Sequence, residues 1–132
     1  MATWTDPGGE ALQVLLGVVA ADALEADETR ASLDAVYERL TGHAIDPAAL
    51  DRGREHARAD PGAWLTAARA LARTLAPAAR EQLLGAAFEI ATADGFVLDE
   101  EDRVLSTLAA ALGMSEAEYR HSVERMLAAA QS

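Results

Sequence analysis

The strongest constraint on the fold is the stretch at residues 90–112, IATADGFVLDEEDRVLSTLAAAL, in which an acidic turn separates two helical patterns. The first pattern ends at Asp94-Gly95, because glycine readily adopts the left-handed conformation that terminates helices. Asp99 is a favourable N-cap for the second helix, and the acids after it complement the dipole of a helix start. Asp94, in contrast, lies at a helix C-terminus, where a negative charge is unfavourable. We therefore expect a compensating group near Asp94.

A similar stretch with a shorter acidic run lies 72 positions earlier in the chain. Residues 18–40, VVAADALEADETRASLDAVYERL, align with it, so that Asp22 falls on Asp94 and residues 27–28 fall on residues 99–100. The copy lacks the glycine and the last two acids of the run. We predict a duplicated helix–acidic loop–helix unit with pseudo-two-fold symmetry, since two copies are too few for a solenoid.

Proline, glycine and capping signals divide the chain into about seven helices. No segment alternates as a strand would, and the alanine-rich composition favours closely packed helices. The first helix is apolar on nearly all sides and is expected to be central, whereas the polar third helix is expected to be peripheral. Gly85, inside the fifth helix, predicts a close approach of a neighbouring helix. The expected helices are residues 11–21, 27–40, 47–59, 61–75, 77–93, 99–112 and 115–130.

The sequence therefore predicts one all-α domain over residues 1–132, a bundle whose first nine residues are irregular. A net charge of −11 without a basic stripe predicts no nucleic-acid partner, because phosphates would be repelled. The chain has no cysteine, which excludes disulfides, thiolate metal sites and cysteine nucleophiles. The apolar run at residues 11–21 is too short to span a bilayer and lacks a basic flank. We expect a cytoplasmic protein that is not inserted in a membrane.

The two acidic segments form the candidate site. Clustered carboxylates beside a glycine turn supply the oxygen ligands that Ca²⁺ and Mg²⁺ prefer. The segment is not an EF-hand loop, because Ile90 and Thr92 would occupy its first and third ligand positions. If the two segments meet in space, they make one divalent-cation site with seven candidate ligands, Asp22, Asp27, Glu28, Asp94, Asp99, Glu100 and Glu101.

Three other interpretations of these acids stay open. They can be structural, as helix caps and as Asx turns that accept loop amides. They can bind a protein partner without any metal. They can also belong to a metal-assisted hydrolase, which would require a concave pocket and a carboxylate of raised pKa. No serine–histidine or nucleotide-binding motif is present, so we expect no organic cofactor and a non-enzymatic function.

Residues 86–119, AAFEIATADGFVLDEEDRVLSTLAAALGMSEAEY, resemble the signature of the TerB-like superfamily. This superfamily is named after tellurite resistance protein B and also includes the N-terminal domain of a membrane-associated DnaJ-like co-chaperone. The resemblance is good over residues 77–130, weaker over 12–40, and no more than compatible over 41–76. The matching residues are Asp94, Gly95, Glu100, Glu101, Leu112, Gly113 and Ser115.

The resemblance implies an all-helical bundle with pseudo-two-fold repeats. It also implies a small cytoplasmic stress-response or scaffolding domain, with an acidic patch that binds metal ions or a protein partner in a stress complex. The absence of thiols, the obvious reductants for tellurite, indicates that any role in tellurite resistance is indirect.

Overall fold

The computed structural model describes residues 9–19, 27–91 and 99–130, with the backbone alone at residues 27–28, 99–101 and 130. These ranges hold seven α-helices and no strand, which confirms the predicted all-α fold. The helices are α1 (Glu10–Val18), α2 (Asp27–Thr41), α3 (Pro47–Ala59), α4 (Ala63–Ala72), α5 (Pro77–Ala91), α6 (Asp99–Ala111) and α7 (Glu116–Ala130).

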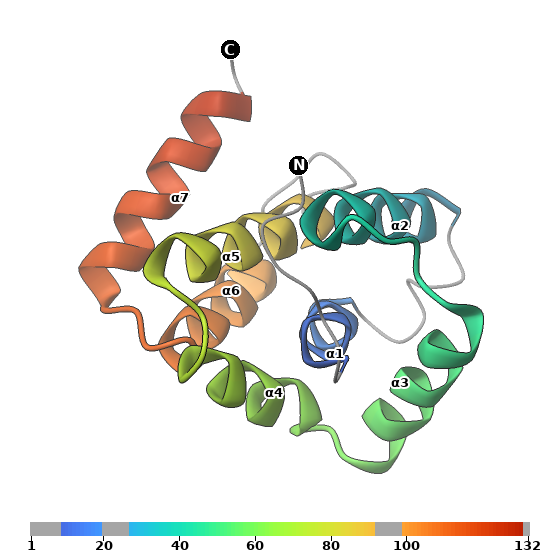
Figure 1. Cartoon of the computed structure of the whole chain (residues 1–132). Coiled ribbons are helices and arrows are strands. Elements are labelled where there is room, and N and C mark those ends of the chain that lie inside the picture. The colour runs from blue at the N-terminus through green and yellow to red at the C-terminus, as the bar shows by residue number, and fades with distance from the viewer. Residues whose placement is uncertain (1–8, 20–26, 92–98, 131–132) are drawn as a thin grey trace.

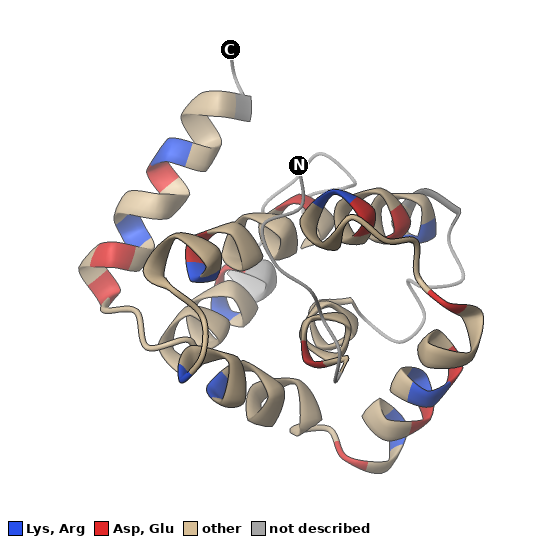
Figure 2. Ribbon diagram, in the orientation of Figure 1, with Lys and Arg blue, Asp and Glu red and all other residues tan. Residues whose placement is uncertain are grey.

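Helix α1 lies at the centre of the bundle. It contacts α3, α4, α5 and α6, and Figure 1 shows it end-on with the other helices around it. Its only charged residue is Glu10. Figure 2 shows that α1 carries far fewer charged residues than α3. Its buried residues are Ala11, Leu12, Val14, Leu15 and Leu16. The prediction that an apolar first helix is central is confirmed, because such a helix can hide its apolar sides only by being surrounded.

The close contact between α1 and α4 is possible because residue 17 is glycine. A Cβ atom built on Gly17 would lie 2.1 Å from Cγ and 2.2 Å from Cβ of Trp64. Separations this short are far inside van der Waals contact, so the indole of Trp64 occupies the space that any other side chain would need. Gly17 therefore sets how closely α1 and α4 approach.

The corresponding prediction for Gly85 is wrong. A Cβ atom on Gly85 would have Met126 Cε as its nearest neighbour, at an ordinary contact distance of 3.7 Å. What faces this Cβ position is the end of a flexible α7 side chain and not the backbone of a neighbouring helix. Gly85 thus lowers helix propensity without a packing need.

Most helix boundaries follow the local signals in the sequence. Gly42, with φ of 79°, follows the last residue of α2, and Asp46-Pro47 begins α3 as predicted. The Asp46 side chain, however, makes no capping hydrogen bond. Helix α1 ends at Val18 and not at the predicted Ala21, because Val19 is already extended.

The start of α4 also differs from its prediction. Asp60-Pro61 is a turn and not the first turn of the helix, since Asp60 Oδ1 accepts a hydrogen bond of 3.0 Å from the Gly62 N–H. An aspartate that bonds the backbone two residues later favours a turn over a helix. The helix then begins at Ala63, with Gly62 as its N-cap.

Helix α7 packs through its first half and projects from the body through its second (Figure 1). Tyr119 and Ser122 are buried, while Val123 and Met126 are half-buried. Leu127 was predicted to face the core, but it is 37% exposed. The helical spacing placed Leu127 with the core-facing residues, but this part of α7 extends beyond the bundle.

We predict that Gly17→Ala destabilises the protein by about 1–3 kcal/mol, the usual cost of overpacking a core. The new methyl group would collide with the indole of Trp64. The matched control is Gly85→Ala, which gains helix propensity of up to about 1 kcal/mol because its methyl group meets no clash.

Thermal and urea unfolding of both variants measures the two changes. A Gly17→Ala variant as stable as the wild type would contradict the described packing of α1 on α4.

Candidate functional site

The two acidic runs stand at the starts of α2 and α6, as predicted. The first residues of these helices are Asp27 and Asp99, which lie 72 positions apart. Carboxylates in a first turn are favourable, because the partial positive charge of the helix dipole lies there. The helix-start interpretation therefore accounts for part of the acidic pattern without a ligand.

The structure describes only part of the predicted cation site. Asp22 and Asp94 lie outside the described residues. The structure places Asp27, Glu28, Asp99, Glu100 and Glu101 in the first turns of their helices but does not describe their side chains. Convergence of these carboxylates on one point stays a prediction.

The packing of the helices is compatible with the proposed internal repeat. A two-fold exchange would swap α1 with α5 and α2 with α6. Under that exchange the contact of α1 with α6 becomes the contact of α5 with α2, and both contacts are present. Helices α1 and α5 also contact each other, as partners across an axis would. The contact of α5 with α6, however, has no counterpart of similar extent between α1 and α2 in the described residues, so the symmetry itself stays a prediction.

Asp102 is the last acid of the run at residues 99–102. It is the one acid of that run whose side chain the structure describes. Its Oδ1 accepts a hydrogen bond of 2.7 Å from the hydroxyl of Tyr119, which also lies 3.2 Å from the Asp102 carbonyl oxygen. This contact joins the first turn of α6 to the first turn of α7. Burial raises the pKa of Tyr119 well above its usual value, and the hydrogen bond and negative charge of Asp102 raise it further.

The sequence did not reveal this contact, although it did predict that Tyr119 faces the core. Tyrosine often combines a buried ring with a polar tip that finds a partner. The partner here is 17 positions away, so no local pattern marks it. Asp102 consequently differs from its neighbours in the acidic run, because one of its oxygens already serves a structural contact.

The predicted capping box before α7 is confirmed. The Ser115 N–H donates to Glu118 Oε1 at 2.9 Å, and the Glu118 N–H donates to Ser115 Oγ at 3.1 Å. These bonds satisfy two donors that a helix start would otherwise leave unpaired. The backbone hydrogen bond from Ser115, followed by the hydroxyl of Ser115, lowers the pKa of Glu118. Glu118 is thus a capping residue.

Within the described ranges, no group of three histidine, aspartate or glutamate side chains is placed to hold a metal ion. His43, His56 and His121 are all exposed, as expected for surface histidines. The side chains of the seven predicted ligands are not among the described side chains. None of the seven described helices is both long and apolar enough to cross a bilayer.

The comparison with known families places the chain. The model of the family described as Tellurite resistance protein TerB matches residues 10–122. The chain belongs to the TerB family. The match begins at the first residue of α1 and continues into α7, so it includes both acidic segments and the whole helical core of this TerB-family chain. Comparisons with curated proteins and with solved structures found no match.

Family membership confirms the resemblance drawn from residues 86–119. It extends that resemblance across the middle of the chain, where the sequence pattern alone was no more than compatible. Helices α3 and α4 are thus part of the TerB-type domain. The relationship to the DnaJ-like co-chaperone stays a prediction.

We predict that the Tyr119–Asp102 contact makes stability fall at alkaline pH. The pKa of Tyr119 is raised in the folded state above its ordinary value of 10.0, so its contribution is fully present below pH 10 and is lost as the pH rises further. In Tyr119→Phe this loss is absent, since phenylalanine has no proton to lose.

Urea unfolding of both proteins between about pH 7 and pH 11 checks this, because that interval brackets the ordinary tyrosine pKa. The stability of the wild type relative to Tyr119→Phe should be constant up to about pH 9 and should then decrease. A constant difference through pH 11 would contradict the described environment of Tyr119.

Proposed function

We propose that this TerB-family chain is a non-enzymatic binding domain that takes a divalent cation, Ca²⁺ or Mg²⁺, at its acidic segments. The observation that carries the proposal is the equivalent placement of two acidic helix starts, Asp27 in α2 and Asp99 in α6. Each helix follows one of two helices, α1 and α5, that pack against each other in the core. Both acidic helix starts thus follow helices of one packed pair in the chain, which supports the proposal of a shared site.

The donor chemistry fits a hard cation. Carboxylate oxygens are the preferred ligands of Ca²⁺ and Mg²⁺, and a chain with net charge −11 attracts cations over a distance. Positions 99, 100 and 101 are successive in α6 and are therefore separated by about 100° around the helix axis. One ion cannot use all three equally, so a complete site also requires donors from the preceding segment, where Asp94 lies in the sequence. A bound cation would neutralise acids that otherwise repel one another.

A second candidate function is a protein-interaction module without metal, as in a stress complex. The outer half of α7 supports it, because Leu127 is exposed and the helix extends beyond the bundle there. The two functions separate cleanly in experiment. Cation binding changes stability with ion concentration, whereas a docking surface on α7 does not depend on ions.

We predict that millimolar Ca²⁺ or Mg²⁺ raises the melting temperature of the EDTA-treated protein by several degrees. A ligand at about 100 times its dissociation constant stabilises by about 2.7 kcal/mol, which is a shift of that size for a small domain. The shift should be lost in Asp94→Asn. Asp51→Asn, which removes an exposed acid on α3, should keep it.

Thermal unfolding with and without each ion measures these shifts. No shift with either ion would exclude the cation proposal and leave the interaction module. If Asp94→Asn is destabilised in EDTA and shifts with ions as the wild type does, the Asx-turn interpretation of Asp94 is correct.

A further inference from the structure

Helix α3 touches the core along a narrow line only. Its one buried residue is Leu50, and the Gln13 amide donates to the Gly53 carbonyl at 3.3 Å. A Cβ atom on Gly53 would lie 2.7 Å from Leu16 Cδ1, so α1 and α3 are closest at this glycine. Beyond Gly53, toward the C-terminal end of α3, a pocket lies between this helix, α1 and the start of α4.

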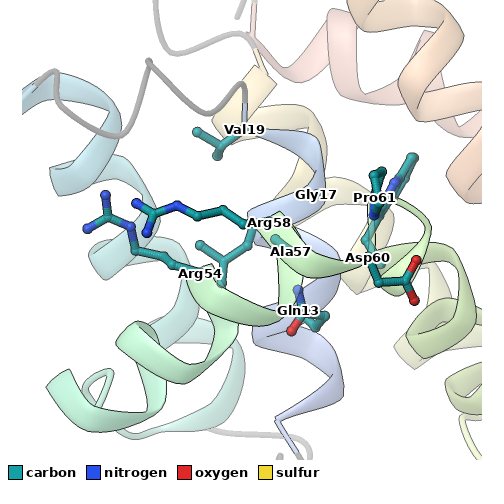
Figure 3. Close-up of a pocket in the computed structure, with 10 residues that line it drawn as sticks. Gln13, Gly17, Val19, Arg54, Ala57, Arg58, Asp60 and Pro61 are labelled. Atoms are coloured by element: carbon teal, nitrogen blue, oxygen red, sulfur yellow. The ribbon is translucent and has the colours of Figure 1, made fainter.

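This pocket has a volume of about 240 Å³ and mainly apolar walls. An apolar cavity of about 150 Å³ holds a benzene molecule, so the space fits a body somewhat larger than one ring. Figure 3 shows the pocket with its lining side chains. The apolar part of the lining is formed by Leu16, Gly17, Val19, Ala57, Pro61 and Trp64.

Two arginines of α3 form one side of the pocket mouth. Arg54 and Arg58 are four positions apart, and so lie on the same face of the helix. In Figure 3 both side chains extend in the same direction, and their guanidinium ends lie on the same side of the pocket. Arg58 is exposed and makes no hydrogen bond or ion pair with the described part of the chain. A cationic group therefore stands beside an apolar pocket.

The acid in the pocket lining, Asp60, does not pair with Arg58. Figure 3 shows the Asp60 carboxylate on the opposite side of the pocket from the guanidinium ends. Its Oδ1 accepts a hydrogen bond from the Gly62 backbone. Helix α3 carries three arginines against two acids, in a chain whose net charge is −11. Figure 2 shows that arginines and acids alternate along α3, so the cationic group at the pocket is the Arg58 guanidinium itself.

We propose that this pocket binds a small organic monocarboxylate, with its apolar body against Trp64 and its carboxylate on Arg58. Ligand pockets typically combine apolar walls with a few polar groups that fix orientation. The planar guanidinium matches a carboxylate through two parallel hydrogen bonds. A doubly charged phosphate monoester is less suitable, because the acidic chain repels a second negative charge. The volume suits a body of about six to eight carbon atoms.

Octanoate is the probe for this site, and NMR of the ¹⁵N-labelled full chain in EDTA is the readout. Three control ligands separate the alkyl chain from the carboxylate. Octanol has the alkyl chain without a negative charge, and octylamine has the same chain with a positive charge. Acetate has the carboxylate without the long alkyl chain. EDTA keeps the experiment independent of the cation proposal. A Trp4→Phe variant assigns the two tryptophan indole signals.

The expected result is a saturable shift of the Trp64 indole signal and of amides in residues 53–58, with a dissociation constant of about 1 mM or below. Arg58→Gln should weaken octanoate binding at least about tenfold, as loss of a charge-assisted pair does. Arg69→Gln, which removes an exposed arginine of α4 outside the lining, should leave it unchanged.

Three results would overturn the proposal: no saturable shift up to about 10 mM octanoate, equal affinity for octanol and octanoate, or unchanged affinity in Arg58→Gln. The first result would show that the pocket does not bind the carboxylate, and the other two would show that Arg58 has no role in binding it. Arg58 is exposed, so its replacement leaves the core packing intact.

Discussion

The contact of Gly17 with Trp64 is the constraint on which the arrangement of this bundle depends. It lets α4 lie against α1 at a distance that no other residue at position 17 would allow. Helix α1 can then bury both its own apolar sides and the inner face of α4, including Ala68 and Leu71. The small residue at this contact makes room for one of the few bulky aromatic side chains of the protein.

Close packing in the centre leaves the periphery less constrained. Helix α3 has Leu50 as its only buried residue, and the outer half of α7 leaves the body altogether. The pocket beside Arg58 lies against one of these outer helices, α3. The acidic starts of α2 and α6 follow α1 and α5 in the chain. A domain with a rigid centre and ligand-accessible outer helices suits a binding function.

The sequence predicted the number of helices and most of their ends, because these depend on local chemistry. Proline at position 47, glycine at position 42 and the Ser115–Glu118 capping box act within a few residues. Contacts between distant segments were not predictable in the same way. Gly17 and Gly85 look alike in the sequence, but the neighbour of one is an indole and that of the other is a flexible methionine. Likewise, nothing local to Asp102 indicates its bond to Tyr119.

Native-state hydrogen exchange measures directly whether α1 is the core around which the bundle assembles. Amides of Val14, Leu15 and Leu16 should exchange only through global unfolding, with a protection free energy equal to that measured by urea. Amides of α3 and of the outer half of α7 should exchange through smaller local openings. If the α1 amides exchange as fast as those of α3, then α1 is not the centre of stability of the bundle.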